Sequence, residues 1–125
     1  VEIVNRAMVL ATDDKAAGRN LFRAAFAPYY ATPVYNKFLA WAGYDEAANA
    51  ITEGWAAKDR EKTTNALTDE MIDEIAIIGS EDEIRERIRE DAAGGVHTSI
   101  IAPLAASPDD LERTFNAFRA DVFQF

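Results

Sequence analysis

The chain has 125 residues, enough for one domain (1–125) with a hydrophobic core of its own. Its formal net charge of −9 at pH 7 argues against nucleic acid and anionic membranes as partners, since both attract a basic face. It has no cysteine, which excludes disulfides and thiol chemistry, and no visible signal peptide or bilayer-length apolar run, so we expect a cytoplasmic protein.

The first stretch, Val1 to Ala11, is rich in β-branched and apolar residues and predicts a strand. It opens without an initiator methionine and with the strand pattern already under way, so we expect a trimmed or proteolytic piece of a longer protein. Thr12 or Asp13 is suited to cap a following helix, because a short polar side chain can accept a hydrogen bond from a helix amide.

The next stretch predicts several helices in succession. Apolar residues at helical spacing form their buried stripes, which are Leu21, Phe22, Ala25, Phe26 and Tyr29, then Val34, Phe38 and Trp41, then Ile51 and Trp55. Pro33 suits the first position of the second helix, and Gly43 ends it. Glu46 to Lys58 predicts a third helix and Asp59 to Leu67 a short further one. We predict that both tryptophans lie in the core.

The stretch from Leu67 to Ala105 carries most of the positional information. A short acidic helix leads into an apolar patch from Ile75 to Ile78. Ser80 and Glu83 then form a reciprocal capping box for a second helix, which Gly94-Gly95 ends. Thr98 to Ala102 predicts a short buried strand, and Pro103 ends it.

The last stretch predicts a helix that starts at Ser107-Pro108 and buries Leu111, Phe115, Phe118 and Val122. The predicted fold is α/β and predominantly helical, with two parallel strands and about five or six helices. Two strands do not make a stable sheet, and a run such as Ser99 to Ala102 needs cover on both faces. We therefore expect part of a larger parallel sheet or barrel.

Several short motifs follow one another in a set order: Tyr29-Tyr30, Pro33-Val34-Tyr35, Gly43, Leu67 to Glu70, Ile78 to Glu83, and Ala93 to Val96. Their order and spacing resemble the C-terminal part of luciferase-like monooxygenases. These are flavin- or deazaflavin-dependent oxidoreductases with a (β/α)8 TIM barrel, and the nearest likeness is to the branch that uses the deazaflavin coenzyme F-420. The resemblance covers nearly all of this chain but only the last part of a family member.

The resemblance implies that Val1 to Ala11 is the seventh barrel strand and Thr98 to Ala102 the eighth. Active sites of such barrels lie at the C-terminal ends of the strands, which here are Thr12-Asp13 and Ala102-Pro103. It implies a small organic substrate and coenzyme F-420 or FMN as cofactor in the full-length parent. Cofactor contacts in this family come mostly from earlier strands, so we expect none bound to this fragment and no activity from it.

Tyr30, Tyr35 and Phe38 are the candidate substrate-pocket residues. They lie in the helical segment that the resemblance places above the catalytic face, where aromatic side chains could line a pocket. The alternative is that they pack the helices of this segment against one another.

Other residues suit structural roles better than catalytic ones. His97 is the only histidine and has no ligand partner nearby, so a structural or exposed role is expected rather than a metal site. The acids Asp69, Glu70, Asp73 and Glu74 have the spacing of a solvated helix face more than of a cation site. Gly94-Gly95 precedes a strand instead of a helix, so it predicts a helix end and not a phosphate loop.

A second interpretation belongs to a different class, a non-catalytic helical module whose exposed strands mediate self-association. In either case we expect a homo-oligomer, because unpaired strand edges and an uncovered apolar face favour association.

Overall fold

The structure is a computed structural model and describes residues 1–124. Its contacts divide the chain into two compact units, Val1–Arg19 with Asp73–Phe125, and Asn20–Ile72. The boundaries fall inside helices α1 (Lys15–Tyr30) and α5 (Asp69–Ile75). Within the described residues, no helix is both long and apolar enough to cross a membrane.

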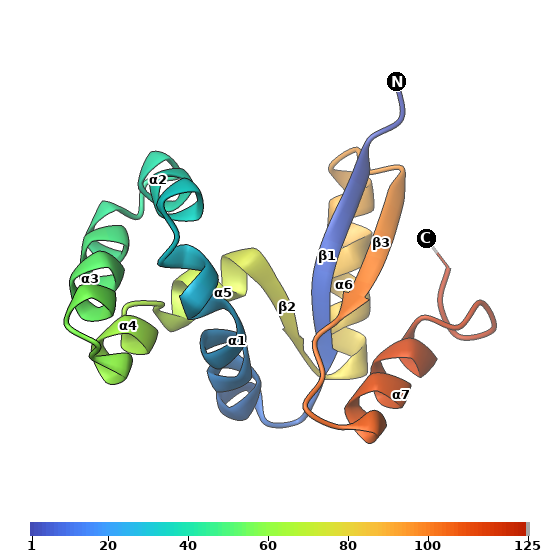
Figure 1. The fold of residues 1–125 in the computed structure, drawn as a ribbon. Helices are drawn as coiled ribbons and strands as arrows, with labels where there is room; N and C mark the ends of the chain where they lie inside the picture. Colours follow the sequence, from blue (N-terminus) through green and yellow to red (C-terminus); the bar gives the residue numbers. More distant parts are fainter. Residues whose placement is uncertain (125) are drawn as a thin grey trace. The chain divides into compact units, whose positions relative to one another are not determined.

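A three-stranded parallel sheet organises the first unit (Figure 1). Its strands are β1 (Val4–Ala11), β2 (Ala76–Gly79) and β3 (Thr98–Pro103), in the order β2-β1-β3. The expectation of two strands is therefore wrong, because it missed β2. This strand has only four residues and follows α5 directly, so its strand character comes from pairing with the end of β1.

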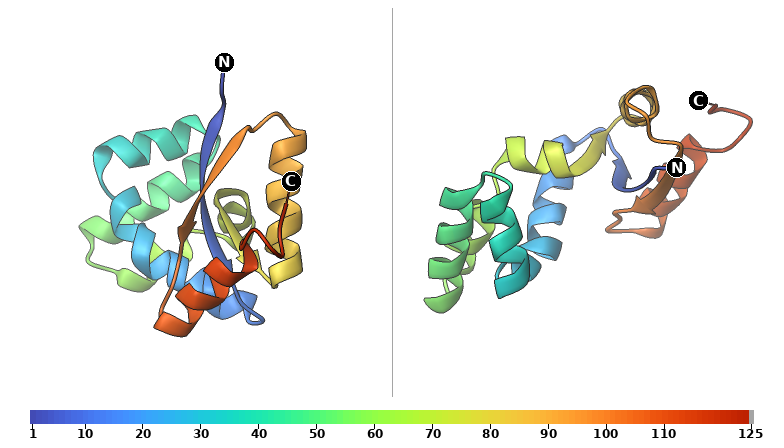
Figure 2. Two further views of the ribbon diagram at one scale, coloured as in Figure 1. Left: turned by 90° about the vertical axis from the view of Figure 1, so that its right-hand side faces the viewer. Right: turned by 90° about the horizontal axis from the view of Figure 1, so that it is seen from above.

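One face of the sheet is covered by α6 (Glu81–Ala93) and α7 (Pro108–Ala117), which Figures 1 and 2 show beside β1 and β3. Alternate residues of β1 point to this side and pack against Ile84 and Ile88 of α6 and Ala117 of α7. Both isoleucines are fully buried, which stabilises the fold by about 1.5–3 kcal/mol for each side chain. This cluster is the core of the unit.

The opposite face of the sheet is largely open along its N-terminal half. Val4 is 52% exposed and Ile100 is 50% exposed, and both lie on this side because side chains alternate along each strand. Toward the C-terminal end, Leu10 is buried near the first turns of α1, where Gly18 leaves room for it. The sheet therefore has one face covered by helices and one partly uncovered.

The strand order also bears on the barrel expectation. Successive strands of a barrel of β/α units are neighbours, which would give the order β1-β2-β3. Here β1 lies in the middle and pairs with both other strands, from Val4↔Thr98 to Val9↔Pro103 on one side and from Met8↔Ala76 to Ala11↔Gly79 on the other. The structure is thus α/β with a parallel sheet, and its strand order is not the sequential one.

The second unit consists of helices only: the rest of α1, then α2 (Pro33–Trp41), α3 (Asp45–Ala56), α4 (Arg60–Asn65) and the start of α5. Its buried residues include Phe22, Leu39, Ile51 and Leu67. Gly54 lets α3 approach α4 closely, since a Cβ there would lie 2.9 Å from the backbone nitrogen of Thr63. The described chain has seven helices, more than the five or six expected.

Several side chains that were predicted to form the buried faces of helices are exposed in the structure. Trp41 is 81% exposed and Trp55 is 54% exposed, so neither is in the core. On α2 the inward residue is Leu39, which leaves the stripe that contains Trp41 outside. On α7 the buried residues are Thr114 and Ala117. Of the predicted stripe, Leu111, Phe115 and Val122 are exposed, and Phe118, just after the helix, is partly buried and packs against the core. Thr114 faces inward because its Oγ1 accepts a hydrogen bond from the amide of Ala11 at the end of β1.

The helix ends follow the sequence closely. The Ser80 hydroxyl accepts the Glu83 amide at 3.4 Å, and the Glu83 carboxylate accepts the Ser80 amide at 2.8 Å, which confirms the capping box. Ser107 caps α7 through the amide of Asp110. The cap of α1 is Asp14, whose carboxylate accepts the Ala17 amide, one position beyond the residues expected.

We predict that Ser80→Ala lowers the melting temperature by a few degrees, because losing such a cap costs about 1 kcal/mol. Ser80→Asp should stay close to the wild type, since an aspartate accepts the same amide. Thermal unfolding followed by circular dichroism compares the three proteins. Equal losses in both variants would mean that Ser80 does not stabilise α6 as a cap.

Candidate functional site

The C-terminal edge of the sheet brings charged residues from three parts of the chain together. Asp13 follows β1, Glu81 follows β2, and Arg113 lies on α7, the helix after β3. Because the three strands are parallel, the segments that leave them meet at one edge. In open α/β sheets and in barrels alike, this edge is where ligands bind.

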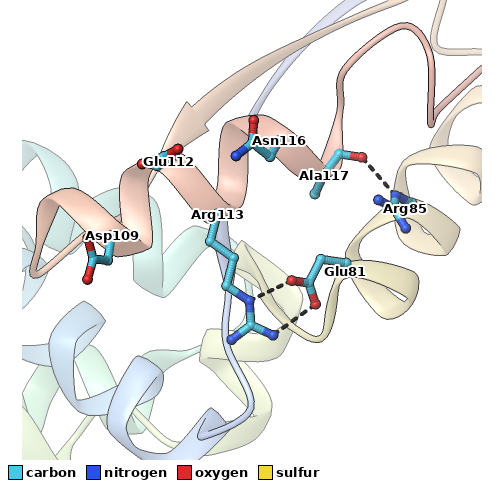
Figure 3. Close-up of a pocket in the computed structure, with 7 residues that line it drawn as sticks. All are labelled: Glu81, Arg85, Asp109, Glu112, Arg113, Asn116 and Ala117. Atoms are coloured by element: carbon cyan, nitrogen blue, oxygen red, sulfur yellow. Dashed lines mark hydrogen bonds and ion pairs between the residues drawn. The ribbon is translucent and has the colours of Figure 1, made fainter.

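Arg113 joins the two carboxylates. Its Nε donates to Glu81 Oε1 at 2.6 Å and its Nη2 to Glu81 Oε2 at 2.8 Å, a two-point contact that Figure 3 shows. The same guanidinium also donates from Nη2 to Asp13 Oδ1 at 3.0 Å and from Nη1 to Asp13 Oδ2 at 3.4 Å. One side chain therefore links the segments that follow all three strands.

These contacts hold Glu81 in its ionised form. The hydrogen bonds from Arg113 lower the pKa of Glu81 to about 2. The hydrogen bonds that Arg113 donates to Glu81 and Asp13 in turn raise the pKa of Arg113. A carboxyl group that stays charged at neutral pH is poorly matched to proton transfer, so Glu81 is better suited to positioning than to acid–base catalysis.

A shallow cleft of about 420 Å³ lies beside this ion pair. It is lined by Glu81, Arg85, Asp109, Glu112, Arg113, Asn116 and Ala117 (Figure 3). The Nε of Arg85 donates to the carbonyl of Ala117, and its Nη1 donates to Asp82, so this guanidinium also has partners. Three carboxylates thus line the cleft, against two guanidiniums that already bind protein oxygens.

The cleft does not fit a flavin or deazaflavin cofactor. The phosphate groups of such a cofactor need free donors and a positive field, and the cleft has acidic walls and occupied guanidiniums. The ion pairs at this edge instead hold the segments that follow the strands in place.

A comparison with protein families matches residues 1–98 to the model described as luciferase-like monooxygenase. The chain belongs to the luciferase-like monooxygenase family. The matched range includes Asp13 and Glu81 and ends at the first residue of β3, so Arg113 lies outside it. Separate comparisons with curated proteins and with solved structures gave no match.

The three aromatic residues predicted for the pocket of this luciferase-like chain lie in the helical unit. Tyr30 ends α1 and is partly buried, and this burial raises the pKa of its hydroxyl. Tyr35 and Phe38 lie on α2, and both are exposed. Tyr35 packs edge-on against Tyr29, and Phe38 packs against Trp41, so each has an aromatic neighbour. Neither the cleft beside Arg113 nor the larger cavity of the helical unit is lined by these three residues, and a pocket role for them stays a prediction.

His97 and two acids of the acidic helix make hydrogen bonds and ion pairs within the described chain. His97 is exposed at the N-terminal end of β3, and its Nδ1 accepts a hydrogen bond from the amide of Ile3. Asp73 receives two hydrogen bonds from Arg19, and Asp69 forms an ion pair with Arg23. No group of three or more His, Asp or Glu side chains within residues 1–124 is placed to hold a metal ion.

A second and larger cavity, of about 720 Å³, lies wholly within the helical unit. It is bounded by α1, α3, α4 and the connection between α3 and α4, with the lining residues Ala24, Ala27, Pro28, Gly54, Trp55, Lys58, Asp59, Arg60, Thr63 and Thr64. This cavity could not be predicted while Trp55 was expected to lie in the core; the side chain is 54% exposed instead. Pro28 inside α1 was the available signal, since proline cannot donate to the carbonyl of Ala24 and so marks an irregular helix.

We predict that Arg113→Ala raises the pKa of Glu81 from about 2 toward its ordinary value of 4.5, because the hydrogen bonds from Arg113 cause most of the depression. Carbon-13 NMR of the side-chain carboxyl groups as a function of pH measures this. Glu83 is the internal control, since Lys15 and Ser80 lower its pKa to about 2 and the variant leaves both in place.

The sign of the pH effect on stability follows from the same shifts. Both glutamates have lowered pKa values in the folded chain, so each stabilises it at neutral pH, and this stability is lost as the pH falls from about 4.5 to about 2. Arg113→Ala should remove the Glu81 part of the loss. An unchanged Glu81 titration in this variant would show that the ion pair does not form in solution.

Proposed function

We propose that this chain forms the C-terminal part of a flavin- or deazaflavin-dependent oxidoreductase that acts on a small organic substrate. The observation that carries the proposal is the family match over residues 1–98. The reaction class is hydride transfer or monooxygenation, and coenzyme F-420 or FMN is the proposed cofactor. The cofactor site lies outside this chain, since the cleft at the C-terminal edge of the sheet is acidic and its guanidiniums have partners.

We also propose that in the complete protein β1 and β3 belong to a (β/α)8 barrel. The packing on the two faces of the sheet supports this proposal. Helices α6 and α7 pack on one face, as helices do on the outside of a barrel, and the other face is open, as expected for the inner face of a barrel wall without its opposite strands. In the mapping that the resemblance implies, β1 and β3 are the seventh and eighth strands, and their direct parallel pairing is that of neighbouring barrel strands. Strand β2 pairs with the other side of β1 and has no place in that mapping.

The role of the chain in such an enzyme is to shape the C-terminal edge of the barrel. Arg113 holds the segments after β1 and β2 together, and the amide of Thr12 donates to the carbonyl of Gly79 at 2.7 Å between the same two segments. Loops fixed in this way present a defined rim to the substrate, which is what catalysis by orientation requires.

We expect the isolated 125-residue chain to show neither saturable binding of F-420 or FMN nor turnover, and the complete gene product that contains it to bind one of the two cofactors. Fluorescence titration of both proteins side by side measures the binding. Turnover by the isolated chain would contradict the assignment of the cofactor site to other parts of the protein. Failure of the complete product to bind either cofactor would contradict the oxidoreductase proposal.

A second candidate function is self-association, and the open face of the sheet favours it. Val4 and Ile100 expose about half of their surface there, and β3 is an edge strand with unpaired backbone groups on its outer side. The charge of −9 opposes association, but salt screens it beyond about 8 Å at physiological ionic strength. Direct apolar contact at this face is therefore expected to outweigh the repulsion, most simply in a symmetric dimer.

We predict that light scattering at tens of micromolar gives a mass above that of the 13.8 kDa monomer. Ile100→Lys should return it to the monomer with little loss of melting temperature, since this side chain is half exposed. Leu111→Lys, on an exposed position of α7, is the matched control and should leave the mass unchanged. A monomeric wild type would show that the helices protect the sheet sufficiently by themselves.

A further inference from the structure

Three helices of the chain end in the same hydrogen-bonded motif. The first residue after the helix cap and the residue that follows it both donate their amides back to carbonyls of the last turn, over 2.8 to 3.1 Å, in α2, α3 and α6. This motif places the first residue after the cap in the left-handed region, where glycine has no steric penalty. That residue is Gly43 after α2 (φ 98°), Gly95 after α6 (φ 105°) and Lys58 after α3 (φ 57°).

Lys58 is the exception. It is the only residue other than glycine with a positive φ among residues 1–124, and it carries a Cβ into a conformation that disfavours one. Glycine solves the same problem at the two other helix ends, so the fold does not require a lysine here. Strain of this kind at a single residue is a reason to look for a function of its side chain.

Lys58 lies at the cavity of about 720 Å³ in the helical unit, a volume within the usual range of small-molecule sites. Much of the wall is apolar and includes Ala24, Ala27 and Pro28 of α1. Trp55 belongs to the same wall and is 54% exposed, so a large aromatic surface is available to a ligand. Ring stacking on such a surface favours a flat aromatic molecule.

The rim of the cavity carries two available cations. Lys58 and Arg60 form no ion pair or side-chain hydrogen bond in the described chain, although it has an excess of acids. The carboxylate between them, Asp59, is engaged as the cap of α4, where it accepts the Lys62 amide at 2.9 Å. An anionic group at this rim would therefore find two donors whose charges are not already compensated.

We propose that this cavity binds a small aromatic carboxylate. The ring lies against Trp55 and the apolar wall of α1, and the carboxylate accepts hydrogen bonds from Lys58 and Arg60. The site lies within the helical unit, in residues 24–64, and its occupancy does not depend on the oxidoreductase activity proposed above. The strained lysine supplies a charge at this helix end that a glycine could not.

The test uses 2-naphthoate as the probe and its uncharged analogue 2-naphthylmethanol as the chemical control, with the whole 125-residue chain in calorimetric titrations. Saturable binding of naphthoate, at least tenfold tighter than that of the alcohol, is expected. Trp55→Leu should weaken binding, and Trp41→Leu, at an exposed tryptophan on α2 outside the cavity, should leave the affinity unchanged.

Lys58→Gly separates function from folding. Because glycine relieves the strain, this variant should melt a few degrees higher than the wild type and yet bind naphthoate about tenfold more weakly, as expected for the loss of one charged hydrogen bond. The reverse exchange, Gly43→Lys at the end of α2, should lower the melting temperature without changing affinity. Equal affinity of Lys58→Gly and wild type, equal affinity for the acid and the alcohol, or no saturable binding would each overturn the proposal.

Discussion

The packing of one face of β1 against α6 and α7 is the constraint on which the sheet-containing unit depends. Ala7, Val9 and Ala11 are small enough for the two helices to lie close to the strand, and Ile84 and Ile88 fill the space between them. The end of the strand is fixed by a buried hydrogen bond from the Ala11 amide to Thr114 Oγ1 at 3.0 Å. That bond satisfies a backbone donor that would otherwise be buried without a partner, and it holds α7 in register with the strand.

This register determines the electrostatics of the C-terminal edge. With Thr114 facing β1, the preceding residue on α7 is directed toward the starts of α1 and α6, where Arg113 contacts Asp13 and Glu81. The result is a guanidinium shared by two carboxylates on segments far apart in the chain. Its donors are used within the protein, which makes the edge rigid and leaves it little capacity to bind an anion.

Features that depend on neighbouring residues could be predicted from the sequence, whereas features that depend on contacts between distant residues could not. The capping box at Ser80, the helix start at Ser107-Pro108 and the glycine at Gly95 were predictable, because each depends on a few neighbouring residues. Strand β2 was not, because four residues after a helix acquire strand geometry only through pairing with β1. The ion pair of Arg113 was equally hidden, since its partners lie 32 and 100 positions away.

The buried faces of the helices could be predicted only in part. Periodicity predicted that α2 and α7 have apolar stripes, but each helix has small or apolar residues on more than one side, and only the packing decides which side is buried. For α2 the choice of Leu39 left Trp41 exposed, and for α7 the choice of Thr114 left Phe115 exposed. Exposed aromatic residues of this kind are then available for contacts outside their own unit.

At the end of α3, Lys58 occupies the left-handed position where glycine is the usual residue, and this departure from the rule is informative. A strained backbone position persists only if something compensates for it, and here the chain supplies its own reference, since Gly43 and Gly95 close two other helices with the same hydrogen bonds and without the strain. A surface lysine kept only for solubility could occupy any exposed helix position at no such cost. Lys58 lies at the rim of a cavity, next to an exposed tryptophan and a second cation without an ion pair. This location is the reason to infer that the strained residue serves ligand binding.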